Sequence, residues 1–224
     1  MTVVSPFESA AEYDDWFETH EGAYRAERAA LERAVPDRFD RALEIGVGTG
    51  RFAAPLGISV GIDPAENPLE RARNRGIESI RGIAESLPVG DETIDLAAFV
   101  TVFSFVDDLA ATLAEAGRVL TDDGTLVVAV LDRSSPVGQL YQEHKDESPF
   151  YADATFLTGD EACAELEAAG FAVEQRLQTV FDDPAEISVA DSNSASNDAG
   201  PDVREGHGDG LFAVIRATPS DTNR

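Results

Sequence analysis

Alternating glycines follow a carboxylate close to residue 45. The stretch ALEIGVGTG, residues 42–50, places Glu44 just before Gly46, Gly48 and Gly50. Glycine adopts positive φ and carries no side chain, so such a turn lets the backbone lie against a ligand where a helix begins. A carboxylate there repels pyrophosphate and attracts an ammonium or sulfonium group. The spacing predicts a cationic ligand, with helix packing by the glycines and amide capping by the acid as the alternatives.

A second acid ends the next strand-like run. Asp63 closes VGID, and parallel strands bring their carboxyl ends to one edge of a sheet, where an acid can accept both hydroxyls of a ribose. The alternative is that Asp63 only starts a turn with Pro64. A dinucleotide fingerprint would need a glycine at position 51, and the chain has Arg51 there. That departure counts against a nicotinamide or flavin cofactor.

Apolar runs and helical patterns alternate around these residues. A helical pattern over 8–35 ends at Pro36, and another, with a capping box formed by Thr158 and Glu161, ends at Gly170. The alternation predicts a doubly wound, three-layer α/β fold with a mostly parallel sheet of seven strands, the last antiparallel. The strand-like runs are 42–45, 57–62, 77–80, 94–100, 125–130, 171–181 and 210–217.

The chain is expected to form a single domain over residues 1–224. Residues 1–36 supply N-terminal helices, and 41–130 form the ligand-binding core. Residues 131–156 are irregular, polar and aromatic, and longer than a usual connection, which favours a lid or substrate-binding insertion over an inert one. Residues 157–224 complete the sheet and include a loop at about 183–209 that is rich in Ser, Asn, Asp and Gly and is predicted to be mobile.

The charge balance is strongly negative. There are 43 Asp and Glu against 17 Lys and Arg, a net charge of -26, and Lys145 is the only lysine. This composition indicates a halophilic source with a salt-rich cytoplasm, and it disfavours nucleic acid as a partner. No basic and apolar leader is present, and no apolar run approaches the roughly 20 residues of a membrane span. A cytoplasmic protein with a small-molecule partner is expected.

Cysteine and histidine usage predicts no metal site. Cys163 cannot form an internal disulfide, and its place in a helical pattern predicts a small buried hydrophobe rather than a nucleophile. A structural zinc needs four ligands, which one cysteine and scattered histidines do not supply.

Four stretches together resemble a known family. ALEIGVGTG, VGIDPAEN, GIAESLPVGDETIDLAAFV and RVLTDDGTLVVAV, within residues 42–130, resemble successive motifs of the class I S-adenosylmethionine-dependent methyltransferases of the type 11 branch. The resemblance implies a Rossmann-like methyltransferase fold and S-adenosylmethionine as the cofactor. It implies that Glu44 and Gly46 serve the methionine end, Gly48 the close approach and Asp63 the ribose. It also implies that Thr101 and Val102 line the sulfonium pocket.

The adenine motif departs from the family pattern. Where the family often has Gly-Asp-Ala, this chain reads Gly82, Ile83, Ala84 and Glu85. Ile83 can pack on the adenine face, and the Ala84 N–H can donate to a ring nitrogen. Glu85 is the candidate to replace the missing acid at the exocyclic amine.

Methyl transfer requires mainly alignment of the acceptor and exclusion of water, with a base only for acceptors that start protonated. The candidate catalytic residues are His144, Tyr13 and Tyr141. The alternatives are an exposed histidine and aromatic residues that only dock the leading helices. The aromatic and histidine candidates for acceptor contact are Tyr13, Trp16, His20, Tyr24, Tyr141, His144 and Tyr151.

These features favour an S-adenosylmethionine-dependent methyltransferase that acts on a small-molecule acceptor. No Asn-Pro-Pro-Tyr or Pro-Cys motif of nucleic-acid methyltransferases occurs. An NAD-dependent Rossmann oxidoreductase and a non-catalytic S-adenosylmethionine-binding module are the alternative hypotheses. The motifs specify neither the acceptor, nor whether O, N or C is methylated, nor the oligomeric state.

The excess of acidic residues predicts that salt stabilises the fold. At molar salt the Debye length is about 3 Å, so repulsion between surface carboxylates is screened almost to contact. We expect the melting temperature to rise steadily between about 0.1 M and 2 M KCl, measured by circular dichroism. A melting temperature that stays level or falls over this range would contradict the prediction.

Overall fold

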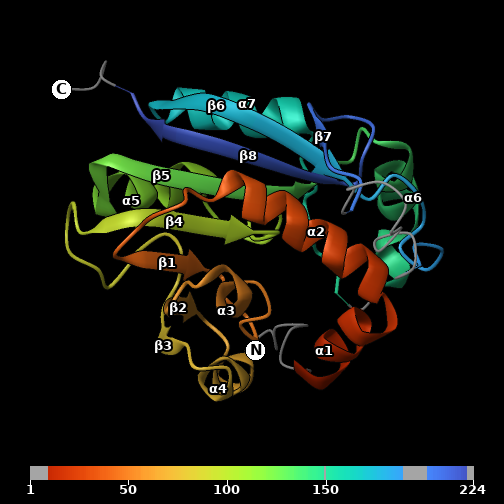
Figure 1. Cartoon of the computed structure of the whole chain (residues 1–224), viewed down its shortest axis with the longest axis horizontal. Helices are drawn as coiled ribbons and strands as arrows, with labels where there is room; N and C mark the ends of the chain where they lie inside the picture. The colour runs from red at the N-terminus through yellow and green to blue at the C-terminus, as the bar shows by residue number, and fades with distance from the viewer. Residues whose placement is uncertain (1–9, 149, 189–200, 221–224) are drawn as a thin grey trace.

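The computed structural model describes residues 10–148, 150–188 and 201–220. These residues build a sheet with the strand order β3-β2-β1-β4-β5-β8-β6-β7, flanked by helices (Figure 1). Its strands are β1 (Ala42–Ile45), β2 (Val60–Asp63), β3 (Glu78–Arg81), β4 (Ile94–Val100), β5 (Leu120–Leu131), β6 (Phe171–Thr179), β7 (Arg204–Glu205) and β8 (Phe212–Pro219).

The sheet has the doubly wound topology that the alternating pattern predicts. Strands β1 to β5 pair in parallel, whereas β8 runs antiparallel between β5 and β6. The direction in which successive strands are added to the sheet reverses at β1, because β2 pairs with one edge of β1 and β4 with the other. In open α/β sheets, ligands bind at the carboxyl ends of the strands on either side of such a reversal.

The prediction of seven strands is wrong by one. The additional strand, β7, is two residues long and pairs antiparallel with β6, with Leu177 opposite Glu205. It lies within the segment 183–209 that was expected to be a mobile loop. Its residues are charged and exposed, so no apolar alternation marks them as a strand. Residues 189–200 of that segment lie outside the described residues.

Helices cover both faces of the sheet, and each face has its own hydrophobic cluster between the sheet and the helices. Along β4, Leu96 and Ala98 pack toward one face, and Ala97 and Phe99 toward the other, as the two-residue period of a strand requires. In Figure 1, α2 crosses the front of the sheet and α5 and α7 lie behind it. The helices are α1 (Ala10–Thr19), α2 (Glu21–Ala34), α3 (Ala53–Leu56), α4 (Glu66–Asn74), α5 (Leu109–Val119), α6 (Pro136–His144), the 3-10 helix η2 (Lys145–Glu147) and α7 (Gly159–Ala168).

Local signals explain several boundaries. The predicted capping box is present at α7, where Thr158 and Glu161 exchange side-chain and backbone hydrogen bonds. Cys163 is buried in the same helix, as predicted. Strand β5 begins before the predicted run at 125–130 and includes Asp122, Asp123 and Gly124, residue types that favour turns, because Leu120 already pairs with Ile94 and the register then shifts before Thr125. The turn-forming residues therefore occupy an irregularity within a longer strand.

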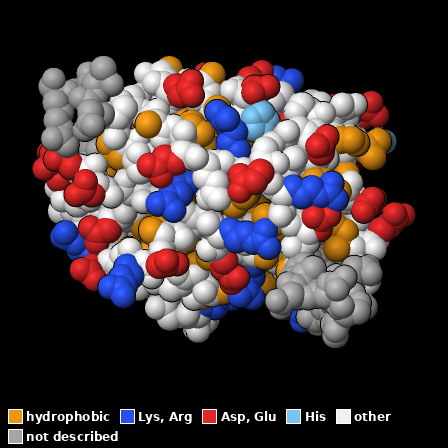
Figure 2. Space-filling view, turned by 45° about the horizontal axis from the view of Figure 1, so that its top comes forward, with side chains coloured by type: hydrophobic (Ala, Val, Ile, Leu, Met, Phe, Trp, Pro, Cys, Tyr) orange, Lys and Arg blue, Asp and Glu red, His pale blue; other side chains and the backbone are white. Residues whose placement is uncertain are grey.

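Acidic and basic side chains are interspersed on the face shown in Figure 2. Arginines form surface ion pairs, such as Arg25 with Glu21 and Arg118 with Asp91. Exposed pairs of this kind contribute little stability, typically about 0–1 kcal/mol each. With a net charge of -26, most carboxylates have no basic residue to match them, which is the physical basis of the expected response to salt.

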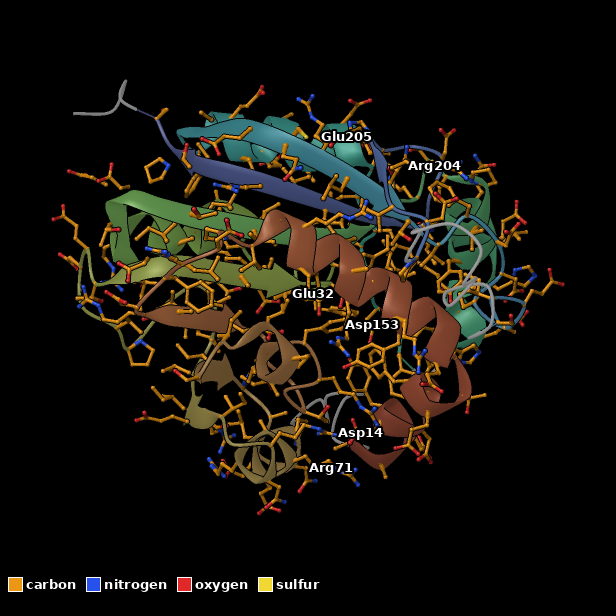
Figure 3. All side chains as sticks on the ribbon, in the orientation of Figure 1. Asp14, Glu32, Arg71, Asp153, Arg204 and Glu205 are labelled. Carbon is orange, nitrogen blue, oxygen red and sulfur yellow. The ribbon has the colours of Figure 1, made fainter. Side chains whose placement is uncertain are left out.

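One buried carboxylate attaches the first helix to the core. Asp14 of α1 is 3% exposed and accepts hydrogen bonds from Thr49 Oγ1 (2.8 Å) and from the guanidinium groups of Arg51 (2.8 Å), Arg71 (2.9 Å) and Arg75 (2.9 Å). Asp14 and Arg71 lie side by side in Figure 3. Arg51, which replaces the last glycine of a dinucleotide fingerprint, thus holds α1 against the turn after β1.

The Asp14 contacts predict a loss of stability in acid. Burial raises the pKa of Asp14, but the four hydrogen bonds outweigh it and lower the pKa to about 2. The stabilisation is therefore present above the unfolded pKa near 4 and is lost as the pH falls toward about 2. We expect Asp14→Asn to lower the free energy of unfolding at pH 7 by about 2 kcal/mol, measured by urea denaturation.

The matched control is the exposed neighbour Asp15, whose change to Asn should leave stability almost unaltered. The difference between Asp14→Asn and the wild type should shrink as the pH is lowered from 5 toward about 2. An equal effect of the two substitutions would show that Asp14 does not anchor α1.

Candidate functional site

A cavity of about 680 Å³ lies at the carboxyl edge of the sheet. The turn after β1, the end of β2 and the segments after β3 and β4 form its wall. Six residues that the sequence assigns to the cofactor line it, namely Gly46, Gly48, Asp63, Ala84, Thr101 and Val102. Their convergence follows from the parallel topology, because β2, β1 and β4 are neighbours that end at the same edge.

The three glycines of the turn differ in what surrounds them, although all have positive φ. A Cβ on Gly46 would lie 2.3 Å from Val102 Cγ2, and one on Gly50 would lie 3.2 Å from Ile77 Cγ1. A Cβ on Gly48 would meet only Tyr13 Cε1, at 4.0 Å. Gly48 therefore exposes its backbone to the cavity, whereas Gly46 and Gly50 allow close packing.

Asp63 holds the glycine turn in place. Its Oδ2 accepts a hydrogen bond from Gly48 N (2.9 Å), and its Oδ1 accepts one from Ala65 N (2.9 Å). The side chain lines the cavity while two backbone donors fix its position.

Glu44 lies beneath the turn and is not on the cavity wall. It is 2% exposed, and its Oε2 has no hydrogen-bond partner within the described part of the chain. Burial first, and then the charge of Asp63, raise the pKa of Glu44 well above its usual range, against a lowering by the Ala53 N–H. A cation bound above the turn would favour the ionised form of this acid.

The segment after β3 presents one apolar and one acidic side chain to the cavity. Ile83 is 51% exposed and lines the cavity, so a flat ring packed against it would cover its apolar surface. Glu85 also lines the cavity, but its Oε1 already accepts a hydrogen bond from Asp107 N (2.9 Å). Glu85 thus ties this segment to the one after β4.

Thr101, directly after β4, has a strained backbone conformation. Its φ of 59° lies in the left-handed region, which is costly for a β-branched residue. Its N–H donates to Ala129 O (2.8 Å) and its Oγ1 to Val100 O (2.7 Å), so neighbouring backbone holds this conformation. Thr101 lies between two cavities and lines both of them.

The second cavity, of about 350 Å³, lies under α1, α2 and α6. Rings from α1, from α6 and from the segment around residue 150 form much of its wall, for example Tyr141 and Tyr151 with centroids 5.8 Å apart. The two cavities share the lining residues Tyr13, Thr101, Phe105 and Phe150. A molecule in one is therefore next to a molecule in the other.

The structure separates the sequence-derived acceptor candidates into two groups. Tyr13, Trp16, Tyr141, His144 and Tyr151 line the second cavity. Two others do not, since Tyr24 donates to Arg51 O (2.6 Å) and the His20 ring stacks on Trp16.

Burial affects the candidate bases. The pKa of Tyr141 is raised to about 12, and the pKa of Tyr13 is raised well above its ordinary value. Burial is the largest cause of both shifts. Both hydroxyls are therefore protonated at neutral pH and can donate hydrogen bonds to a ligand. The Nδ1 of His144 lies 3.0 Å from Leu140 O, which leaves Nε2 as the ring nitrogen available to the cavity.

Sequence reasoning missed Glu27, which lines the second cavity. The signal was present, because Glu27 falls on the buried stripe of α2 together with Ala23, Ala30 and Leu31. A carboxylate at such a position is rarely buried without a reason. Asp153 and Phe150 were also missed as lining residues of the larger cavity, since an irregular segment has no periodicity to place them.

Residues 10–148, 150–188 and 201–220 contain no group of three or more His, Cys, Asp or Glu side chains placed to hold a metal ion. No helix in those ranges has the length and apolar character needed to cross a bilayer.

Topology, glycine turn and ribose-type acid together define a nucleoside-binding domain of the Rossmann-like class. Comparison with known proteins identifies the family. Residues 43–128 match the methyltransferase domain family. An uncharacterized protein of Methanocaldococcus jannaschii is 39% identical over 208 residues, which is 93% of this chain and 95% of that protein.

A solved structure from Thermotoga maritima, described as an S-adenosylmethionine-dependent methyltransferase and possible histamine N-methyltransferase, is 40% identical. Its TM-score is 0.87, with 96% of this chain and 99% of that chain covered. The ubiquinone biosynthesis O-methyltransferase of Azorhizobium caulinodans is 29% identical over 63% of this chain and 62% of that protein. The chain belongs to the class I S-adenosylmethionine-dependent methyltransferases.

S-adenosylmethionine is therefore the cofactor, and the site fits it. The space beside Gly48 admits a ligand against bare backbone, and Asp63 stands at the strand end that receives a ribose. The unpartnered Oε2 of buried Glu44 suits a ligand that brings positive charge.

The glycine geometry predicts two different outcomes of adding a methyl group. Gly46→Ala should destabilise the fold strongly, through contact with Val102. Gly48→Ala should lower the free energy of unfolding by only about 1–2 kcal/mol, the cost of a left-handed alanine, but should weaken binding of S-adenosylhomocysteine. Thermal unfolding and titration calorimetry measure the two effects. Undiminished affinity in Gly48→Ala would refute the idea that Gly48 contacts the cofactor.

Proposed function

We propose that the protein transfers the methyl group of S-adenosylmethionine to a small molecule held in the aromatic cavity. The cofactor would lie in the larger cavity, with Gly46 and Glu44 toward its methionine end, Gly48 along its backbone path and Asp63 at the ribose. The remaining contacts would be Ala84 at the adenine and Thr101 with Val102 near the sulfonium.

The observation that carries this proposal is the shared wall between the cavities. Tyr13, Thr101, Phe105 and Phe150 line both, so an acceptor and the cofactor can meet without leaving the protein. The second cavity, about 350 Å³, is of the size that binds small ligands, about 300–1,000 Å³. The acidic composition supports the same class of acceptor.

Bound cofactor supplies an electrophilic methyl carbon, so the protein's tasks are alignment and exclusion of water. The segment 131–156 contributes α6, η2 and the aromatic residues after them to the cavity wall. Together with α1, held to the core by Asp14, it forms the cover of the site. Tyr13 and Tyr141 can donate hydrogen bonds to the acceptor, and His144 can accept one through Nε2 when that nitrogen is unprotonated.

The alternative functions make different demands on the same residues. An NAD-dependent oxidoreductase would place a pyrophosphate next to the acids Glu44 and Asp63, which electrostatics disfavour. A non-catalytic S-adenosylmethionine-binding module would not need the second cavity. The acidic composition further supports a salt-rich cytoplasm as the working environment.

Calorimetry in molar KCl provides the test. The wild type should bind S-adenosylhomocysteine more tightly than NAD, and Asp63→Ala should weaken that binding by about tenfold or more, as expected for loss of hydrogen bonds to a charged group. Asp123→Asn, an exposed acid at the start of β5, is the matched control and should bind normally. Failure of the folded wild type to bind S-adenosylhomocysteine would reject the proposal, and tighter binding of NAD would favour the oxidoreductase.

A further inference from the structure

The acceptor cavity has an acid in its wall that the proposed cofactor site does not use. Glu27 of α2 is 5% exposed and lines the cavity beneath the aromatic rings. No hydrogen bond or ion pair to Glu27 is formed by the described residues. The neighbouring positions on the same stripe are alanines, Ala23, Ala26 and Ala30, so a small apolar residue would fit the helix packing without the cost of burying a carboxyl group.

Its surroundings do not neutralise it. Lys145 also lines the cavity, but its Nζ donates to Ala154 O (2.9 Å), and it forms no ion pair with Glu27 in the described residues. The other titratable groups that line the cavity are Tyr13 of α1, Tyr141 and His144 of α6, and Tyr151. Burial raises the pKa of Glu27 to about 8, so the group is mostly neutral while the cavity is empty.

The rings add a second feature that selects for positive charge. Aromatic faces carry partial negative charge and attract ammonium groups, most strongly where water is excluded. Trp16, Tyr13, Phe17 and Tyr151 all line the cavity with Glu27. An anionic acceptor would face this carboxyl group and those rings, with the acid Asp63 beyond Tyr13 adding to the repulsion.

We propose, on the basis of the function proposed above, that the acceptor is a small amine with an apolar body and that the carboxylate of Glu27 binds its ammonium group inside the aromatic cavity. The result would be methylation of nitrogen, which neither the motifs nor the cofactor site specify.

The same carboxylate solves the chemical problem of an amine acceptor. An ammonium has no lone pair and cannot attack a methyl group, so it must first lose a proton. In a buried pair, the N–H bond breaks with its electron pair left on nitrogen, the O–H bond forms on Glu27, and both groups become neutral. Low polarity favours this exchange, because burial disfavours both charged forms. Transfer then forms the N–C bond as the C–S electron pair returns to sulfur, and the proton on Glu27 leaves to solvent.

The test uses phenethylamine and 2-phenylethanol, a cation and a neutral alcohol of similar shape, in the presence of S-adenosylhomocysteine. Trp16 is the only tryptophan and lines the cavity, so its fluorescence reports occupancy. The amine should bind at least tenfold more tightly than the alcohol. Glu27→Gln should remove that preference, whereas Glu32→Gln, an exposed acid on the same helix (Figure 3), should retain it.

Calorimetry of the wild type in buffers of different ionisation enthalpy gives a second readout that needs no variant. Because burial raises the pKa of Glu27 to about 8, binding of the ammonium at pH 7 should release protons, up to one per bound molecule. If Glu27→Gln does not fold, this measurement decides alone.

Any of four results would overturn the inference: equal binding of amine and alcohol, amine binding that survives Glu27→Gln, no proton release, or no binding of either probe. Binding of S-adenosylhomocysteine in the same samples separates this failure from failure of the proposed function, since the cofactor site can be intact while the amine site is not.

Discussion

A carboxyl group taken out of water loses hydration that hydrogen bonds or a positive charge must replace. In this protein each cavity has such a group beside it. Glu44 lies under the glycine turn with an unpartnered oxygen, and Glu27 stands in the wall of the aromatic cavity. The core alone does not satisfy them. The ligands that suit both positions are cationic, which applies to the sulfonium cofactor on one side and to the proposed amine on the other.

Two other acids, Asp63 and Asp14, have hydrogen-bond donors within the protein, and their contacts hold the site together. Asp63 uses its carboxylate to fix the glycine turn, and Asp14 joins α1 to the turn and to α4 through three arginines. Helix α1, which contributes to the wall of the aromatic cavity, is thereby connected to the glycine turn. Arg51 directly follows the glycine turn in sequence and donates a hydrogen bond to Asp14 of α1. The residue that departs from a dinucleotide fingerprint therefore has a structural role of its own.

The cofactor half of the site could be predicted from the sequence to a large extent. Glycine spacing, a strand-terminal acid and the period of apolar residues are local properties, and parallel strands bring their ends together by rule. The acceptor half could not be predicted in this way. Glu27 is separated from Tyr141 and Tyr151 by more than a hundred residues and by irregular segments, so no spacing joins them. Tyr24 and His20 are of the same residue types as the tyrosines and the histidine that line the cavity. Their side chains make other contacts, and only the tertiary structure shows this.

Strand β7 shows the same limit, since two charged residues carry no strand pattern and form a strand only because β6 offers an edge. The sequence by itself determined the doubly wound class and the order of its main elements, and it indicated the cofactor through its motifs and an expected response to salt through its acidity. These follow from backbone period, glycine chemistry and net charge, which act over short range or over the whole chain. Only the tertiary structure decided which acids are buried, which rings face one another and that two cavities share a wall, because desolvation and contact depend on residues that are distant in the chain.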